Sequence, residues 1–204
     1  MTRFPQITRR GALTLTAGAL ALASGRATAL TATAAEDFVE SLIKDLRALV
    51  EDDRKGPEGA AEFLALLERK STLEAVGRFA MGRTWRDMSE AQQAAYQAAF
   101  RTYISNTYQR RFGEYSGEDI SLTGVLDAGQ KGVLVKSVVT RPSAEPVTVE
   151  WLVTDRTGSP LLSDIIFEGV SLAITLRETF GGMVDKRNGD IDLFIADLAA
   201  SHGA

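Results

Sequence analysis

The sequence predicts an α+β fold: a single domain of helices plus a curved four-stranded antiparallel sheet that together enclose an apolar cavity. Apolar residues recur at a helical period of about 3.6 residues up to Ser116, at a strand period of about two between Ile120 and Glu168, and at the helical period again beyond Ser171. Short turns separate the strand segments, which favours an antiparallel meander. Helices laid over the concave face of such a sheet leave room for a cavity between the layers.

Residues 1–29 have the pattern of an export signal. Four arginines and no acidic residue accompany an apolar run, residues 11–23, that is too short to span a bilayer. The pair Arg9–Arg10 is similar to a twin-arginine signal, and cleavage sites follow at residues 27–29 and 32–34. We therefore expect a periplasmic protein whose folded domain spans residues 35–200. An uncleaved N-terminal anchor is the alternative.

Composition excludes several kinds of chemistry. The chain has no cysteine, and its one histidine, His202, lies next to the C-terminus. A thiol nucleophile, a thiolate zinc site and a histidine-based catalytic triad are therefore not expected. The net charge of −4, more negative once the arginine-rich signal is removed, argues against bulk binding of nucleic acid. We expect no catalytic residues, no metal site and no cofactor.

Four amphipathic helices are predicted before the sheet, over residues 35–52, 57–70, 71–82 and 90–115. Ser89 followed by Gln92 has the spacing of a capping box at the start of the fourth. Trp85 falls in the connector before it. All four tyrosines of the chain lie on this longest helix, mostly on one stripe. They form either ordinary aromatic core or one wall of an apolar pocket.

The strands are predicted over residues 120–126, 133–141, 147–154 and 161–168. In the third strand, Val149, Trp151 and Val153 share one apolar face, whereas the other face is mixed. Two further helices follow, over residues 171–186 and 190–200, separated by a turn at Asn188–Gly189.

The stretch from Asp164 to Phe180 runs from a strand with apolar residues on both faces into a helix. Asp164 and Glu168 are four residues apart and project to one side of the strand, as an acid/base pair would. Carboxylates so placed more commonly meet arginines or cap helices, and Arg177 is a candidate partner. Ser171 follows Gly169 as in a nucleophile elbow, but without the second glycine or a base it is predicted to cap the helix.

Six arginines cluster in the helical half of the sequence. They either receive an anionic headgroup or form surface ion pairs. These residues are Arg78, Arg83, Arg86, Arg101, Arg110 and Arg111.

Two segments carry a resemblance to a known family. Residues 79–85 (FAMGRTW), 89–100 and 114–117 (EYSG), with Tyr103 and Tyr108 between them, are similar to the first half of the MlaC family, also called the toluene-tolerance family. Asp164, residues 168–172 (EGVSL), Arg177 and Phe180 are similar to its second signature. Residues 160–163 (PLLS) depart from the family, which usually has tryptophan and another aromatic residue there.

The resemblance implies a carrier without catalysis in the Mla pathway, which maintains lipid asymmetry of the outer membrane. Such a carrier takes phospholipid between an inner-membrane ABC-transporter complex and an outer-membrane lipoprotein–porin complex. Two alternatives remain: an enzyme on a similar scaffold with Asp164 as general base, and a structural adaptor with a dry, tightly packed core.

Eleven residues are predicted to line the acyl chains. They are apolar or aromatic and lie on the long helix, the strands and the start of the following helix. They are Trp85, Tyr103, Tyr108, Phe112, Val135, Val149, Trp151, Ile166, Val170, Leu172 and Ile174.

Overall fold

The computed structural model describes residues 30–51, 56–112, 118–141, 144–155 and 158–201, so the predicted export signal lies outside the described residues. The helices are α1 (Ala32–Glu51), α2 (Pro57–Lys70), α3 (Leu73–Met81), α4 (Thr84–Asp87), α5 (Glu90–Phe112), α6 (Leu172–Lys186) and α7 (Ile191–Ala200). The strands are β1 (Asp119–Asp127), β2 (Val133–Arg141), β3 (Ala144–Thr154), β4 (Leu161–Phe167) and β5 (Val170–Ser171). The α+β prediction is confirmed.

The strands form one antiparallel sheet in the order β1-β2-β3-β4-β5, which is the predicted meander with one strand more. The additional strand, β5, has two residues and pairs with the end of β4. A two-residue strand shows no periodicity, so the sequence pattern did not reveal it. Trp85 also differs from expectation, since it lies in the short helix α4 and not in an irregular connector.

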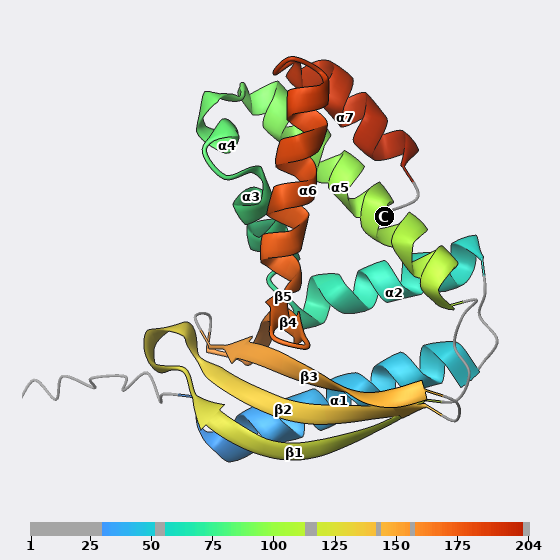
Figure 1. Ribbon diagram of the computed structural model, residues 1–204, viewed down its shortest axis with the longest axis vertical. Helices are drawn as coiled ribbons and strands as arrows, with labels where there is room; N and C mark the ends of the chain where they lie inside the picture. Colours follow the sequence, from blue (N-terminus) through green and yellow to red (C-terminus); the bar gives the residue numbers. More distant parts are fainter. Residues whose placement is uncertain (1–29, 52–55, 113–117, 142–143, 156–157, 202–204) are drawn as a thin grey trace, which may run out of the picture.

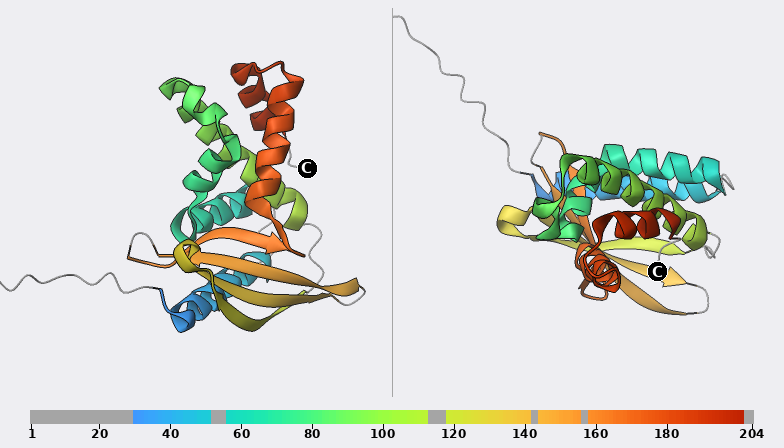
Figure 2. Two further views of the ribbon diagram at one scale, coloured as in Figure 1. Left: turned by 60° about the vertical axis from the view of Figure 1, so that its left-hand side comes forward. Right: turned by 90° about the horizontal axis from the view of Figure 1, so that it is seen from above.

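The molecule has two lobes (Figures 1 and 2). The sheet and α1 form one lobe, helices α3 to α7 form the other, and α2 lies between them. The chain crosses between the lobes again where β5 leads into α6, and the parallel bridge between Ser71 and Leu162 ties the end of α2 to β4. No helix in the described part of the chain is both long and apolar enough to cross a membrane.

The core of the sheet lobe is built by the face of the sheet that packs on α1. Val135 pairs with Trp151, and Ser137 pairs with Val149, so these side chains share that face with their neighbours on β2 and β3. Val39 and Leu42 of α1 are fully buried in the same cluster. The period of two in β2 and β3 is therefore explained by burial beneath α1.

The helical lobe has a separate aromatic core. Tyr96 and Phe100 of α5, Phe180 of α6 and Phe194 of α7 are each 0% exposed, and Tyr103 packs edge-on against Phe180 with ring centroids 5.3 Å apart. The Tyr96 hydroxyl donates to the Gly77 carbonyl at 2.8 Å, which satisfies its polar tip. Burial raises the pKa of Tyr96 far above its usual range, so this residue stays neutral.

Helix α2 contributes to both cores. Leu66 is buried in the cluster of the sheet lobe, whereas Leu64 and Leu67 pack against the cluster of the helical lobe. The buried residues otherwise fall into two separate clusters. The lobes are therefore joined by the shared helix α2 and by two chain crossings, from α5 to β1 and from β5 to α6. The core of one lobe does not continue into the core of the other.

The capping box predicted at Ser89 is present at the start of α5. The Gln92 backbone N–H donates to Ser89 Oγ at 3.2 Å, and the Ser89 N–H donates to Gln92 Oε1 at 3.1 Å. Replacing Ser89 with alanine should lower the free energy of unfolding by about 1 kcal/mol. Urea denaturation measures this effect. Ser105→Ala, which changes the same residue type within α5, serves as the control, and equal losses in the two variants would contradict the capping role.

Candidate functional site

The junction between β4 and α6 is a tight hairpin that is held from the side by β3. Glu168 and Gly169 both have positive φ values, 48° and 80°, which reverse the chain between Phe167 and Val170. Glu168 is fixed by Thr148, whose backbone N–H and hydroxyl donate to Glu168 Oε1 at 2.6 and 3.0 Å. The strained residue is therefore anchored by three bonds to one partner, since its own N–H also donates to the Thr148 carbonyl.

Asp164 holds the other side of the junction. Its carboxylate accepts from the Ile165 N–H at 2.9 Å, from the Ala173 N–H at 3.1 Å and from the Ser171 hydroxyl. Ser171 in turn accepts from the Ile174 N–H at 3.2 Å and so caps α6, as predicted. The expectation that Arg177 partners Asp164 is wrong, because Arg177 lies over the ring of Phe79, 5.2 Å from its centroid.

Glu168 gives the junction a dependence on pH. Hydrogen bonds from the Thr148 backbone and side chain hold the pKa of its carboxyl below the ordinary value. Its stabilisation is therefore complete above about pH 4.3, the pKa in an unfolded chain, and is lost as the pH falls through the folded-state pKa. We expect the stability difference between the wild type and Glu168→Gln to shrink when urea denaturation is moved from about pH 6 to about pH 3. A difference that stayed constant would contradict this role.

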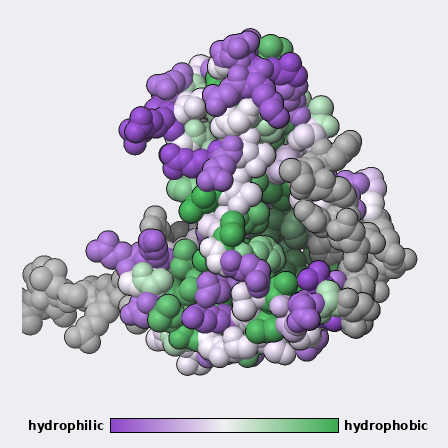
Figure 3. Space-filling view, in the orientation of Figure 1, coloured by the Kyte–Doolittle hydropathy of each residue, from purple (hydrophilic) through white to green (hydrophobic). Residues whose placement is uncertain are grey.

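Four large apolar side chains are left exposed at this junction. Phe167 is 48%, Val170 59%, Leu172 39% and Ile174 49% exposed. They lie within eight residues of sequence, where the chain passes from the sheet into the helical lobe. Figure 3 shows a hollow beside this crossing, between the helices of the upper lobe and the sheet, with apolar atoms on its inner surface. Exposed apolar residues gathered at a hollow indicate a surface that binds something apolar.

Three of the predicted acyl-lining residues lie in the core of the sheet lobe. Val135, Val149 and Trp151 are at most 5% exposed and pack in the cluster that includes α1. The Trp151 indole N–H donates to Ser137 Oγ at 2.9 Å, and this hydroxyl donates to the Val149 carbonyl at 2.8 Å. Their contact with a lipid stays a prediction, and the structure gives them a packing role beneath α1.

The other predicted residues are dispersed. Trp85 and Tyr103 belong to the helical core, where Trp85 meets the Tyr96 ring edge-on. Ile166 is half-buried on the sheet face opposite Trp151. The side chains of Tyr108 and Phe112 lie outside the described residues. Val170, Leu172 and Ile174 lie close in sequence at the junction, and each is exposed.

Phe167 belongs to this junction group but is not among the eleven residues that were predicted to line the acyl chains. Its neighbour Ile166 was selected instead, because alternation along β4 does not show which face meets solvent. The sequence did contain a signal for Phe167, namely the two turn residues Glu168 and Gly169 that follow it. An apolar residue directly before a two-residue turn pairs with the residue directly after it, which here is Val170.

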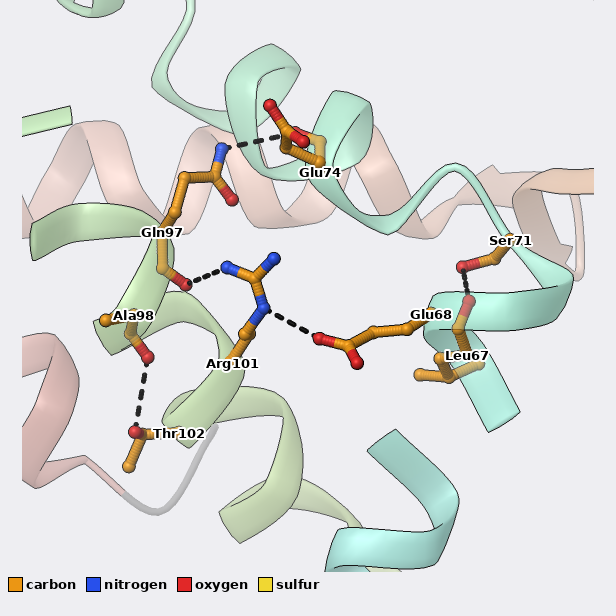
Figure 4. A network of polar contacts seen from close by, with 8 residues as sticks. All are labelled: Leu67, Glu68, Ser71, Glu74, Gln97, Ala98, Arg101 and Thr102. Atoms are coloured by element: carbon orange, nitrogen blue, oxygen red, sulfur yellow. Dashed lines mark hydrogen bonds and ion pairs between the residues drawn. The ribbon is translucent and has the colours of Figure 1, made fainter. Parts of the chain in front are cut away.

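Two arginines of the predicted cluster have partners within the protein, and Figure 4 shows those of Arg101. Arg101 donates to Glu68 Oε1 at 2.8 Å and to the Gln97 carbonyl at 3.2 Å. Arg78 lies over the Trp85 ring, 5.4 Å from its centroid. Arg101 and Arg78 line a polar cleft of about 590 Å³ together with Glu68 and Glu74, so its charges are balanced. The side chains of Arg110 and Arg111 lie outside the described residues.

Metal-ligand geometry is absent from the site as far as the structure describes it. Within the ranges from residue 30 to 201 that are described, no group of three or more histidine, aspartate or glutamate side chains is arranged to hold an ion. The carboxylates at the junction instead accept hydrogen bonds from backbone and hydroxyl donors. The arrangement provides an exposed apolar surface to which a ligand can bind. It also provides a strand-to-helix junction that hydrogen bonds hold in place.

Together, the two-lobed α+β fold, the hollow and the anchored junction define a binding protein with an apolar site beside a strand-to-helix crossing. The chain belongs to the MlaC family, because the model of the family described as MlaC protein matches residues 36–200. A phospholipid-binding protein from Ralstonia solanacearum, solved in complex with a phospholipid, has a similar structure, with a TM-score of 0.65 and 23% sequence identity. The match covers 81% of this chain and 98% of that chain, and it shows a shared fold.

Proposed function

We propose that this protein is a phospholipid carrier that holds acyl chains in the hollow between its two lobes. The observation that carries the proposal is the exposure of four large apolar side chains at the crossing between the lobes, next to which Figure 3 shows the hollow. They are Phe167, Val170, Leu172 and Ile174. Membership of the MlaC family and the phospholipid complex of the Ralstonia protein support the same ligand. The exposed apolar residues at the junction do not favour the adaptor alternative, which predicts a dry, tightly packed core.

Energetics favour exchange with a membrane or a partner over uptake from water. Removing two acyl chains of about thirty methylenes from water would yield roughly 24 kcal/mol, at about 0.8 kcal/mol per methylene. In a bilayer the chains are already dry, so a hollow that only matches the bilayer can load and release lipid at nearly equal free energy. The phosphate stays at the mouth of the hollow, because burying its unpaired charge would cost more free energy than the protein gains by taking the chains from a bilayer.

We propose further that the carrier works in the periplasm. The arginine-rich pattern of residues 1–29 supports export, and family membership supports exchange with the inner-membrane ABC-transporter complex and the outer-membrane lipoprotein–porin complex. No catalysis is assigned to the site. The Asp164 carboxylate accepts three hydrogen bonds that hold the junction, which accounts for this residue without a role as general base.

Placing a charge at the junction should impair lipid uptake. Ile174→Asp is expected to reduce the uptake of a fluorescent phospholipid from phosphatidylethanolamine–phosphatidylglycerol vesicles by about tenfold or more, because the carboxylate would lose hydration against acyl chains. The thermal unfolding midpoint should change little, since Ile174 is 49% exposed.

Leu193→Asp is the matched control for this experiment. Leu193 is an apolar residue of α7 with 51% exposure, so the substitution adds the same charge at a similar solvent position. Uptake that is unchanged in both variants would contradict a lipid site at the junction. Equal loss in both would show that added charge alone, and not its place, impairs uptake.

A further inference from the structure

Arg177 of α6 is held in place by its neighbours, yet its hydrogen-bond donors are free. The guanidinium lies over the Phe79 ring, 5.2 Å from the ring centroid, where α3 packs beside α6 (Figure 1). No acceptor or carboxylate is paired with the Arg177 side chain in the part of the chain that the structure describes. A guanidinium that is stacked in this way can present its planar set of N–H donors to a ligand from outside.

The end of α3 leaves room for this side chain. Gly82 follows the last residue of the helix with a φ of 57°, a left-handed value that favours glycine. A Cβ added at Gly82 would lie 3.1 Å from both Nε and Nη2 of Arg177, so a larger residue would crowd the guanidinium. Arg83 comes next in the sequence and is exposed, without an ion-pair partner among residues 30–201 where these are described. A second positive charge therefore extends from the backbone beside Arg177.

The carboxylates of the neighbouring elements do not pair with this guanidinium. Glu178 follows Arg177 directly, and consecutive residues of a helix do not face each other. Glu74 lies in the first turn of α3, whereas the guanidinium lies at the other end of that helix. Asp164 already accepts from three donors, and Asp87 lies one helix further along, in α4. The described carboxylates thus leave Arg177 available to an anion.

The position of Arg177 favours an anion that is attached to apolar chains. Ile174, which is 49% exposed at the junction, lies three residues before Arg177, so the two side chains share one flank of α6. Three residues of an α-helix rise by about 4.5 Å. A phospholipid has a similar arrangement, because only a glycerol unit separates its phosphate from its acyl chains. A free anion could meet the guanidinium, but it would leave Ile174 uncovered.

We propose that Arg177 binds the phosphate of the phospholipid whose acyl chains lie against Ile174, an inference that rests on the proposed function. The guanidinium donates to the phosphate oxygens, Phe79 supports its plane, and Arg83 adds positive charge. Because Arg177 is exposed, the phosphate keeps its contact with water and no charge is buried. A lipid without a phosphate gains nothing from this contact, so the protein should prefer phospholipid to diacylglycerol.

The test compares a fluorescent phosphatidylglycerol with a diacylglycerol that carries the same fluorescent acyl chain. Both are offered at equal mole fraction in phosphatidylethanolamine–phosphatidylglycerol vesicles, and the ratio of phospholipid to diacylglycerol taken up by the protein is measured. Arg177→Gln should lower this ratio by about two- to fivefold, as expected for an exposed ion pair, and should leave diacylglycerol uptake unchanged. Added salt should lower the ratio more in the wild type than in Arg177→Gln, because salt screens exposed charges.

Arg86→Gln is the matched control, because Arg86 is an exposed arginine of α4 that forms no ion pair with any described residue. It should leave the ratio unchanged, and an equal fall in both variants would overturn the proposal in favour of a general effect of charge. An equal loss of both lipids in Arg177→Gln would overturn it in favour of a structural role.

Inorganic phosphate distinguishes a free anion from a lipid headgroup. If the wild type bound inorganic phosphate saturably and Arg177→Gln did not, while the lipid ratio was the same in both, the site would belong to a free anion and the proposal would be overturned. Failure of the proposed function looks different, because the wild type would then take up neither lipid. A wild type that takes up both lipids at the ratio seen in Arg177→Gln would contradict the phosphate site alone.

Discussion

Replacing Phe180 with alanine is expected to lower the free energy of unfolding by about 3–5 kcal/mol, the largest loss predicted for this protein. Phe180 is 0% exposed at the centre of the helical lobe. Its ring lies 5.3 Å from Tyr103, 5.9 Å from Phe194 and 6.1 Å from Phe100, measured between centroids. These neighbouring rings come from two other helices, α5 and α7, so the resulting cavity cannot close by the movement of one side chain.

The thermal unfolding midpoint should fall by about 6–20 °C in this variant, since each kcal/mol corresponds to about 2–4 °C in a chain of this length. Phe79→Ala is the matched control. Phe79 is 44% exposed, and its removal should cost only about 1 kcal/mol through partial burial and the contact with Arg177. Similar losses in the two variants would contradict the position of Phe180 in the core.

Replacing Asp164 with alanine is expected to lower the free energy of unfolding by about 2–4 kcal/mol. The substitution removes the acceptor for the N–H groups of Ile165 and Ala173 and for the Ser171 hydroxyl. Hydrogen bonds to a charged group contribute about 1.5–3 kcal/mol each, but the losses are not additive because the donors share one carboxylate. Asp164→Asn keeps one oxygen acceptor and should lose less.

Glu178→Ala is the control for Asp164, because it removes an exposed carboxylate from α6 and should change stability by less than about 0.5 kcal/mol. If Asp164→Ala were as stable as this control, the role assigned to the junction would be contradicted. The same variants address catalysis. Below its unfolding temperature, Asp164→Asn should still take up phospholipid from vesicles, which an enzyme that needs Asp164 as a base would not predict.

Local signals made much of the fold predictable. Ser89 with Gln92 and Ser171 with Ile174 cap their helices through groups that are three residues apart, so the sequence alone contains both partners. The bounds of α2 and β2 follow in the same way from a proline at the start of the helix and from alternation along the strand. These features depend on neighbours along the chain.

The site was less predictable because it depends on which layer covers which face. A period of two groups Val135, Val149 and Trp151 on one face, but it does not show that α1, nearly 100 residues earlier in the sequence, covers that face. The prediction that Arg177 partners Asp164 was wrong for a similar reason, since the guanidinium of Arg177 lies over the ring of Phe79 on α3. Val170, Leu172 and Ile174 lie at one junction because they are neighbours in sequence, and their contact with a lipid stays a prediction.

The central claim is that acyl chains occupy the hollow beside the junction. The most direct measurement is native mass spectrometry of the protein purified without detergent from the cells that naturally produce it, followed by solvent extraction and lipid analysis. We expect a bound phospholipid in the wild type and in Leu193→Asp, and its loss in Ile174→Asp. Wild-type protein that carries no phospholipid and takes none from phosphatidylethanolamine–phosphatidylglycerol vesicles would contradict the claim.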